Sequence, residues 1–163
     1  MNERHQRNYE TRMRGKYGEI PTPLTPEQFE VGYSRIEDTM TSALAEQTQP
    51  DVLAVILFGS WTHGNPHIQS DVDFNLILSD EGFLRKYTVG YSFINDLQSR
   101  GLQNLDPWLF LSKDEFVREH KRTFYRDFKV FSTNPRIHGL AENSRSKHQS
   151  RGISQFIPGI SLF

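Results

Sequence analysis

Hydrophobic and polar residues follow a helical period in one part of the chain and strand-like runs in the next, and these patterns predict the type of each element. Across residues 26–47 the apolar positions recur every three or four residues, which is typical of a helix with one buried face. Thr25 and Gln28 form a capping box at its start, with a proline at the first helical position. The continuous apolar run at 51–58 has the length of a strand covered on both faces, and 72–79 predicts a second strand.

The second half of the chain predicts a helix, a strand, another helix and a last short strand. Residues 80–101 indicate a helix closed by a glycine, and 105–111 indicate a third strand. Ser112 opens a second capping box, which predicts a helix to about Tyr125, and a short strand follows at 128–132. The side chains expected to face inward from the first of these helices are Phe83, Leu84, Tyr87, Tyr91, Ile94 and Leu97. The later aromatic residues expected in the core are Trp108, Phe110, Phe116, Phe124 and Phe128.

The order of these elements predicts the fold class. Helix, strand, strand, helix, strand, helix is the order of a small mixed β-sheet flanked by helices, an α+β arrangement with α/β character. At 163 residues the chain has the size of one domain, which we expect to span residues 25–133. Residues 1–24 are interpreted as a basic, mobile arm with a Pro-rich lead-in, and 134–163 as a tail, either loose or docked on the core or another chain.

Composition narrows the function classes only slightly. The formal net charge is −1, which is typical of a soluble globular protein without an overall bias towards nucleic acid. Cysteine is absent, which excludes disulfides and thiolate metal sites, and no apolar run is long enough for a membrane span. The charged start lacks the apolar stretch of a secretory signal, so a cytoplasmic location is the default expectation. Nucleic-acid binding through the basic residues 1–16 is a further hypothesis that we do not favour, because the remaining domain is not basic.

Asp71 and Asp73 stand one residue apart at the start of the second predicted strand, in the apolar segment "DVDFNLIL". Successive side chains of a strand alternate between its faces, so both carboxylates and Asn75 are expected on one face, with the two Asp Cα atoms about 6.6 Å apart. Unpaired, two such anions would repel each other and lose hydration. A divalent cation resolves both problems, and oxygen ligands favour Mg²⁺ or Mn²⁺ over zinc. The alternative is a solvated strand end that carries two acids.

Gly59 and Ser60 directly follow the first predicted strand. A glycine there lets the backbone approach a bulky anion, and exposed N–H groups with the Ser60 hydroxyl are suitable donors to phosphate oxygens. The end of the first predicted strand therefore offers hydrogen-bond donors to phosphate, and the second predicted strand offers metal ligands. A nucleoside triphosphate with its metal needs both. The alternative reading of Gly59 and Ser60 is an ordinary turn.

The segment "FGS", followed after ten residues by "DVDF", resembles the signature of the minimal nucleotidyltransferases, in the DNA-polymerase-beta-like superfamily. The resemblance covers roughly residues 53–111 and implies the palm-type fold of these enzymes. It also implies a third carboxylate on the strand after the intervening helix, where Asp106 stands. In the family this residue usually completes the metal site and helps to activate the attacking hydroxyl. The rival carboxylates, all on predicted helices, are Asp96, Asp114 and Glu115.

Other residues near this segment are assigned more simply. His63 lies in the loop where the family often carries a basic residue, so it is a candidate phosphate ligand, although a loop histidine without a ligand is an equal alternative. Trp61 is expected to pack in the core. Pro107 follows Asp106 and removes a backbone donor, which suits a strand start or an edge strand. A solvated helix face is the expectation for Lys113, Arg118, Lys121 and Arg122.

The resemblance implies a Mg²⁺- or Mn²⁺-dependent enzyme that transfers a nucleoside monophosphate from an NTP, with ATP favoured, to an acceptor hydroxyl and releases pyrophosphate. Gly59, Ser60 and His63 would hold the phosphates. Since little of the chain follows the predicted core, we expect that either a partner chain completes the site or the acceptor is itself a protein. The acceptors that we consider are protein and RNA. Short members of the family often act with a helical partner protein in toxin–antitoxin pairs. The alternative is a non-catalytic, antitoxin-like subunit of the same fold that binds a nucleotide or a partner.

Overall fold

A computed structural model gives the fold, and it describes residues 10–11, 13–48, 50–120 and 128–133. Residues 1–9 and 12 of the predicted N-terminal arm, the end of the helix expected to reach Tyr125, and the whole tail 134–163 lie outside the described residues. Residues 13–17 are helical, and Met13 is buried. The domain boundaries stay predictions. Within the described part of the chain, no helix combines the length and apolar character needed to cross a membrane.

The first long helix, α2, spans Pro26–Ala45 and begins where its capping box places it. The Thr25 hydroxyl accepts a hydrogen bond from the backbone N–H of Gln28 (3.3 Å), and the Gln28 amide oxygen accepts from the backbone N–H of Thr25 (2.9 Å). These reciprocal bonds satisfy two donors that a helix start leaves unpaired. Ile36, Met40 and Leu44 lie on the buried face of α2, as the apolar period predicts.

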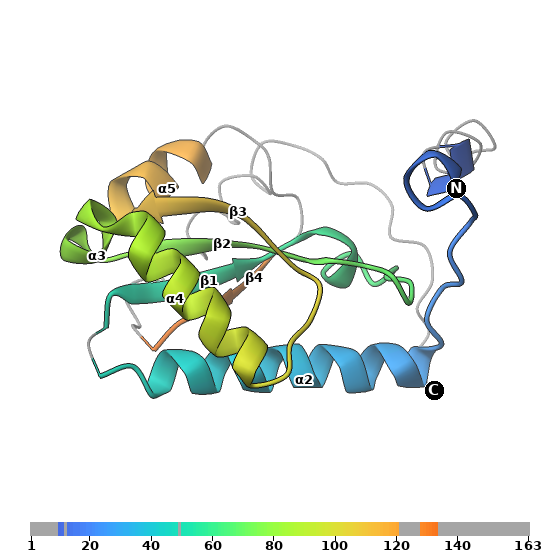
Figure 1. Ribbon diagram of the computed structural model, residues 1–163, viewed down its shortest axis with the longest axis horizontal. Coiled ribbons are helices and arrows are strands. Elements are labelled where there is room, and N and C mark those ends of the chain that lie inside the picture. Colours follow the sequence, from blue (N-terminus) through green and yellow to red (C-terminus); the bar gives the residue numbers. More distant parts are fainter. Residues whose placement is uncertain (1–9, 12, 49, 121–127, 134–163) are drawn as a thin grey trace, which may run out of the picture.

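Four strands form one mixed sheet in the order β3-β2-β1-β4 (Figure 1). β1 (Val52–Leu57) pairs antiparallel with β2 (Val72–Leu78) and with β4 (Lys129–Phe131). β2 pairs in parallel with β3 (Leu105–Ser112), the end strand of the sheet among the described residues. The predicted mixed sheet is confirmed, as are all four predicted strands.

Both faces of the sheet are covered, which explains the continuous apolar run of β1 and the apolar residues on both faces of β2. One face packs with α2 and with α4 (Lys86–Ser99) in a cluster that includes Val55 and Phe74. The other face contributes Ile56 and Ile77 to a second cluster, which α5 (Lys113–His120) completes with Phe116. Figure 1 shows α2 and α5 on opposite sides of the strands. The predicted capping box at Ser112 opens α5.

The predicted helix over 80–101 is wrong in its continuity and in part of its buried face. It divides at Arg85 into α3 (Asp80–Leu84) and α4, so the apolar stripe changes phase at the break. Leu84, Tyr87 and Tyr91, which we expected to face inward, are exposed. The residues that α4 buries are Val89, Gly90, Phe93, Ile94 and Leu97.

Gly90 explains why α4 lies so close to the edge strand. A Cβ atom at this position would come within 2.6 Å of the Phe110 ring, so only glycine fits the present spacing. Tyr87 and Tyr91 then flank the same ring edge-on, with centroid distances of 6.2 and 5.8 Å. Their rings thus shield Phe110 from one side while remaining largely exposed themselves.

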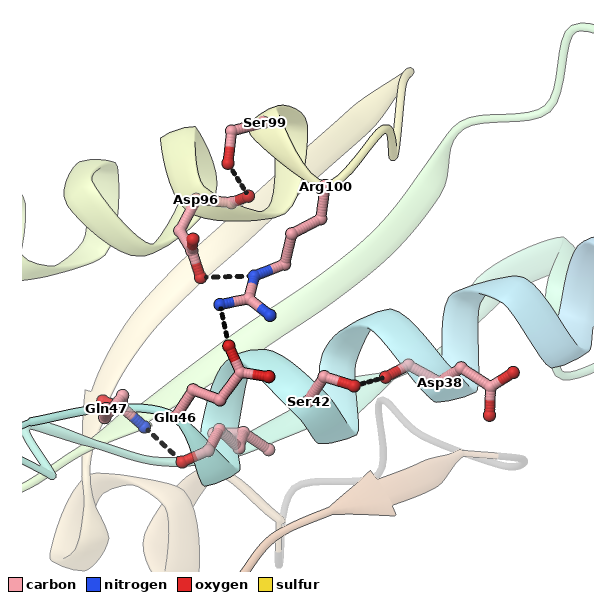
Figure 2. Close-up of polar contacts among 8 residues, drawn as sticks. Asp38, Ser42, Glu46, Gln47, Asp96, Ser99 and Arg100 are labelled. Atoms are coloured by element: carbon pink, nitrogen blue, oxygen red, sulfur yellow. Dashed lines mark hydrogen bonds and ion pairs between the residues drawn. The ribbon is translucent and has the colours of Figure 1, made fainter.

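A polar network joins the C-terminal ends of α2 and α4 (Figure 2). The Arg100 guanidinium bonds to Glu46 (3.0 Å) and to Asp96 (2.9 Å). Nearby, the side-chain amide of Gln47 donates to the Leu44 carbonyl, which closes the end of α2. Asp96 therefore has a structural role between two helices.

Candidate active site

Gly59 turns the chain immediately after β1, at the start of a short 3₁₀ helix that spans Gly59–Trp61. Its φ angle of +76° lies in the left-handed region that favours glycine. The position is also enclosed, because a Cβ atom at Gly59 would overlap Oδ2 of Asp73 and lie 3.0 Å from its Cγ. The adjacent backbone is tied to the same residue, since the Phe58 N–H donates to the Asp73 carbonyl (3.0 Å). The Gly-Ser turn and Asp73 thus form one packed unit.

The loop after Gly59 folds back on its own start. The backbone N–H groups of Thr62 and His63 both donate to the Gly59 carbonyl (3.2 and 3.1 Å), and the Asn65 N–H donates to the Ser60 carbonyl (3.2 Å). The side chain of His63 is exposed on this loop. Ser60 is partly buried and lies in the 3₁₀ turn itself. The assignment of Ser60 and His63 to phosphate binding stays a prediction.

Trp61 packs in the core, as the sequence predicts. It is buried, and its ring stacks on Phe29 of α2 with a centroid distance of 6.0 Å. Gly32 of α2 leaves room for the indole, because a Cβ atom there would approach the ring to 2.7 Å. This packing anchors the 3₁₀ turn to α2.

The carboxylates of the site come from two neighbouring parallel strands. Asp73 on β2 and Asp106 on β3 are register partners, so the two acids lie side by side across the strand pair. Asp71 directly precedes β2, which begins at Val72. Val72, Phe74 and Leu76 pack into the cluster on the α2 side, so the predicted division of the strand between its two faces is confirmed. Asp106 stands on an end strand of the described sheet, in keeping with Pro107.

Asp73 is partly buried, and burial raises its pKa above the ordinary carboxyl value. The neighbouring charges of Asp106 and Asp71 raise this pKa further. The indole N–H of Trp108 opposes the shift by donating to Oδ1 of Asp73 at 3.2 Å, and the charge of Lys16 acts in the same direction. Asp73 is therefore a poorly hydrated carboxylate with two other carboxylates near it, whereas Asp106 itself is exposed.

Asp71 is paired with a cation of the chain itself. The ammonium group of Lys16 lies 2.9 Å from Oδ2 of Asp71. The pKa of Lys16 is raised, first by its contact with the Tyr17 hydroxyl and then by Asp71. Tyr17 in turn packs edge-on against His67 at 5.1 Å, and burial lowers the pKa of that histidine. The short helical segment 13–17 thus brings a positive charge to the candidate metal ligands.

The donor chemistry of these residues fits a hard divalent cation. Asp71, Asp73 and Asp106 offer carboxylate oxygens, the ligands that Mg²⁺ and Mn²⁺ prefer. Asp73 and Asp106 are register partners, and the raised pKa of Asp73 reflects its burial and the two neighbouring carboxylates. As the side chains of the described residues stand, no three His, Cys, Asp or Glu residues converge on one point. Asp71 faces Lys16, and Asp73 faces Trp108.

The rival carboxylates have other roles or lie elsewhere. Asp96 is held by Arg100, and Glu115 completes the capping box of α5 by accepting from the Ser112 N–H (3.1 Å). Asp114 is exposed in the first turn of α5. Of the basic residues, Lys113 and Arg118 are exposed on α5, whereas Lys121 and Arg122 lie outside the described residues. Asp106 is therefore the carboxylate on β3 that lies beside Asp73.

Trp108 is the residue at the site that sequence reasoning missed. It was expected in the core, but its side chain is 62% exposed and reaches Asp73. The reason is a register shift, because Phe74 pairs with Pro107 whereas Asn75 pairs with Leu109. This β-bulge inserts Trp108 as an extra residue in β3. The proline before it is the sequence signal that could have indicated an irregular strand.

The match to a known family includes the Gly-Ser turn and the three carboxylates. Residues 41–121 match the family model described as "Polymerase beta, Nucleotidyltransferase". No curated protein matches the chain.

Solved structures share a limited likeness. A proposed nucleotidyltransferase from Sulfolobus solfataricus is 17% identical, with a TM-score of 0.34 over 63% of this chain and 78% of that one. A mutant of the toxin–antitoxin MntA-HpeT is 15% identical, with a TM-score of 0.40 over 71% of this chain and 88% of that one. A toxin–antitoxin structure with AMP-PNP is 16% identical, with a TM-score of 0.38 over 71% of this chain and 88% of that one.

Proposed function

The chain belongs, through residues 41–121, to the polymerase beta nucleotidyltransferase family, and from this premise we propose that it is a Mg²⁺-dependent nucleotidyltransferase. It would transfer a nucleoside monophosphate from an NTP, with ATP preferred, to a hydroxyl group of an acceptor. The hydroxyl oxygen forms a bond to the α-phosphorus, and the bond from that phosphorus to the bridging oxygen breaks. Pyrophosphate leaves with the electron pair, and the hydroxyl proton passes to a base.

The three carboxylates would hold the metal and the acceptor proton. Asp71 and Asp73 would bind the cation, and Asp106 would complete its ligand set beside the acceptor and help to accept the hydroxyl proton. A bound Mg²⁺, or Mn²⁺ in its place, supplies neutralisation of the phosphate charge. For Asp71 to join this ligand set, its carboxylate would have to release the ammonium group of Lys16, because both cations would occupy the same carboxylate.

The Gly-Ser turn would hold the phosphates of the NTP. Gly59 and Ser60 begin a 3₁₀ helix, whose first N–H groups have no acceptor within the helix. The Ser60 hydroxyl adds a further donor, and His63 stands exposed on the adjoining loop. Since Gly59 contacts Asp73 directly, phosphate donors and metal ligands would meet at one place.

The observation that carries this proposal is the contact between Gly59 and Asp73 beside Asp106. A solvated strand end would not need a glycine pressed against its carboxylate, nor a second acid at the paired position of the next strand. In contrast, catalysis of nucleotidyl transfer is mostly positioning and charge neutralisation, for which such a compact acidic site is suited.

Transfer of label from α-³²P-labelled NTPs to lysate macromolecules, in the presence of Mg²⁺, tests the proposal. Wild-type protein should transfer label, most readily from ATP, and the variants Asp73→Asn and Asp106→Asn should not. Asp96→Asn is the matched control, since it neutralises a carboxylate that contacts Arg100 away from β2. Absence of label transfer from every NTP, or transfer by Asp73→Asn at the wild-type rate, would contradict the proposal.

Calorimetry separates an enzyme from a subunit that only binds. The enzyme should bind a non-hydrolysable ATP analogue with Mg²⁺ and lose that binding in Asp71→Ala/Asp73→Ala. Binding of the analogue without any label transfer supports the non-catalytic alternative. The sensitivity of the labelled product to protease or to ribonuclease then identifies the acceptor as protein or RNA. Recovery of a labelled protein would also give the partner that the family resemblance leads us to expect.

A further inference from the structure

We propose that Trp108 is a positioning residue that fixes the carboxylate of Asp73 for metal binding, through its indole N–H. The proposal rests on the function proposed above and adds a residue to the site. Trp108 lies on a strand whose exposed residues also include Asp106 and Leu109, and it is the large aromatic residue among them. Its side chain is 62% exposed, yet the ring is held at two points: the N–H donates to Asp73, and the ring meets Phe58 edge-on at 5.5 Å.

Both oxygens of Asp73 have a defined neighbour. Oδ2 lies against Gly59, in the space that a Cβ atom would occupy there. Oδ1 accepts the indole N–H at 3.2 Å. The carboxylate plane is therefore set between the Gly-Ser turn on one side and Trp108 on the other. A carboxylate has about four acceptor positions, so one hydrogen bond leaves room for a cation.

The bulge in β3 is what brings Trp108 to this place. Pro107 lacks a backbone N–H, and the strand pairing resumes only at Leu109. The amide of Asn75, almost fully buried, accepts the Leu109 N–H at 3.0 Å and so stabilises the register after the bulge. The extra residue also shifts the alternation of side chains along β3 by one position. Asp106 and Leu111 therefore lie on the same face of the sheet, where Asp106 pairs with Asp73 and Leu111 pairs with Ile77. The bulge is therefore an integral part of β3.

Hydrogen-bonding partners of metal ligands orient those ligands, and their loss commonly reduces metal affinity by about 10- to 100-fold. Trp108 makes a neutral, partly exposed hydrogen bond, so we expect an effect near the lower end of that range. Because the side chain is exposed, its replacement should leave the stability of the fold nearly unchanged. A loss of metal affinity without a loss of stability is the signature of positioning.

Mn²⁺ binding measured by electron paramagnetic resonance tests the proposal on the full chain, without relying on turnover. Trp108→Phe retains a ring beside Phe58 and removes the donor, and it should bind Mn²⁺ about tenfold more weakly than wild type. Trp108→His restores a ring N–H and should recover part of the affinity. Urea denaturation of both variants should give wild-type stability. Wild-type Mn²⁺ affinity in Trp108→Phe would overturn the proposal.

The indole resonances give a second readout. The chain has two tryptophans, so its ¹H–¹⁵N spectrum should contain two indole cross-peaks, assigned by the loss of one in Trp108→Phe. Addition of Mg²⁺ should shift the Trp108 peak and should not shift the Trp61 peak. The indole N–H of Trp61 is buried and has no hydrogen-bond partner among the described residues. If wild type binds metal but Trp108 does not respond, the positioning role is wrong and the proposed function stands. If wild type binds no metal, both are wrong.

Discussion

Replacement of Gly59 by alanine should abolish nucleotidyl transfer while leaving a folded protein. The φ angle of +76° at this position makes any side chain unfavourable, by about 1–2 kcal/mol for a left-handed non-glycine residue. The new Cβ would also overlap Oδ2 of Asp73, so the carboxylate must leave its present rotamer, at about 0.5–1.5 kcal/mol more. The expected total is about 1.5–3.5 kcal/mol, which a domain of ordinary stability survives.

Gly64→Ala is the matched control for this experiment. Gly64 has nearly the same φ angle, +71°, but a Cβ atom there would meet nothing within 4 Å. It should therefore lose only the backbone component, about 1–2 kcal/mol, and keep label transfer and Mn²⁺ binding. Urea denaturation and Mn²⁺ titration of the two variants together measure the difference. If Gly59→Ala binds Mn²⁺ as tightly as Gly64→Ala, the contact between the turn and Asp73 has no functional meaning.

Three further predictions concern the same site and the helix behind it. Because the fold raises the pKa of Asp73, its ionisation opposes folding, so stability should fall as pH rises through the ordinary carboxyl range. In the presence of a chelator, Asp73→Asn should therefore have a larger free energy of unfolding than wild type at pH 7. This gain in stability should shrink below about pH 4, where Asp73 of the wild type is protonated. An equal gain at both pH values would refute the link between the pKa of Asp73 and stability. Lys16→Met should change stability by less than about 1 kcal/mol, since the ion pair is exposed, but should tighten Mn²⁺ binding by freeing Asp71; unchanged Mn²⁺ affinity would show that the two cations do not compete. Gly90→Ala should lose about 1–3 kcal/mol in thermal unfolding, because the new methyl group meets Phe110; wild-type stability would mean that α4 moves aside freely.

Local patterns were sufficient to predict most of the sheet and the helix starts. The run at 51–58 is almost entirely apolar and 72–79 carries apolar residues on both of its faces, because both faces of their strands are covered. The two capping boxes are local hydrogen-bond patterns, so Thr25 and Ser112 could be assigned from neighbours three residues away. Asp106 lies on β3 as the register partner of Asp73, and its role as the third carboxylate stays a prediction.

The errors came from contacts between distant segments. Tyr87 and Tyr91 continue an apolar period, but the break at Arg85 and the close approach at Gly90 turn them outward beside Phe110. The orientation of Trp108 depends on a bulge that exists only when β3 pairs with β2. The ion pair of Lys16 with Asp71 joins residues 55 positions apart, which no local period encodes.

Pro107 and the bulge at Trp108 have a second effect, because in the described sheet β3 has a neighbouring strand on one side only. The open side of such a strand is a template on which a foreign chain can extend the sheet. Pro107 lacks a backbone N–H and Trp108 is an inserted residue, so the hydrogen-bonding edge is interrupted near the middle of β3. The irregularity that directs an indole towards the acidic pair therefore also makes this border of the molecule a poor seed for aggregation.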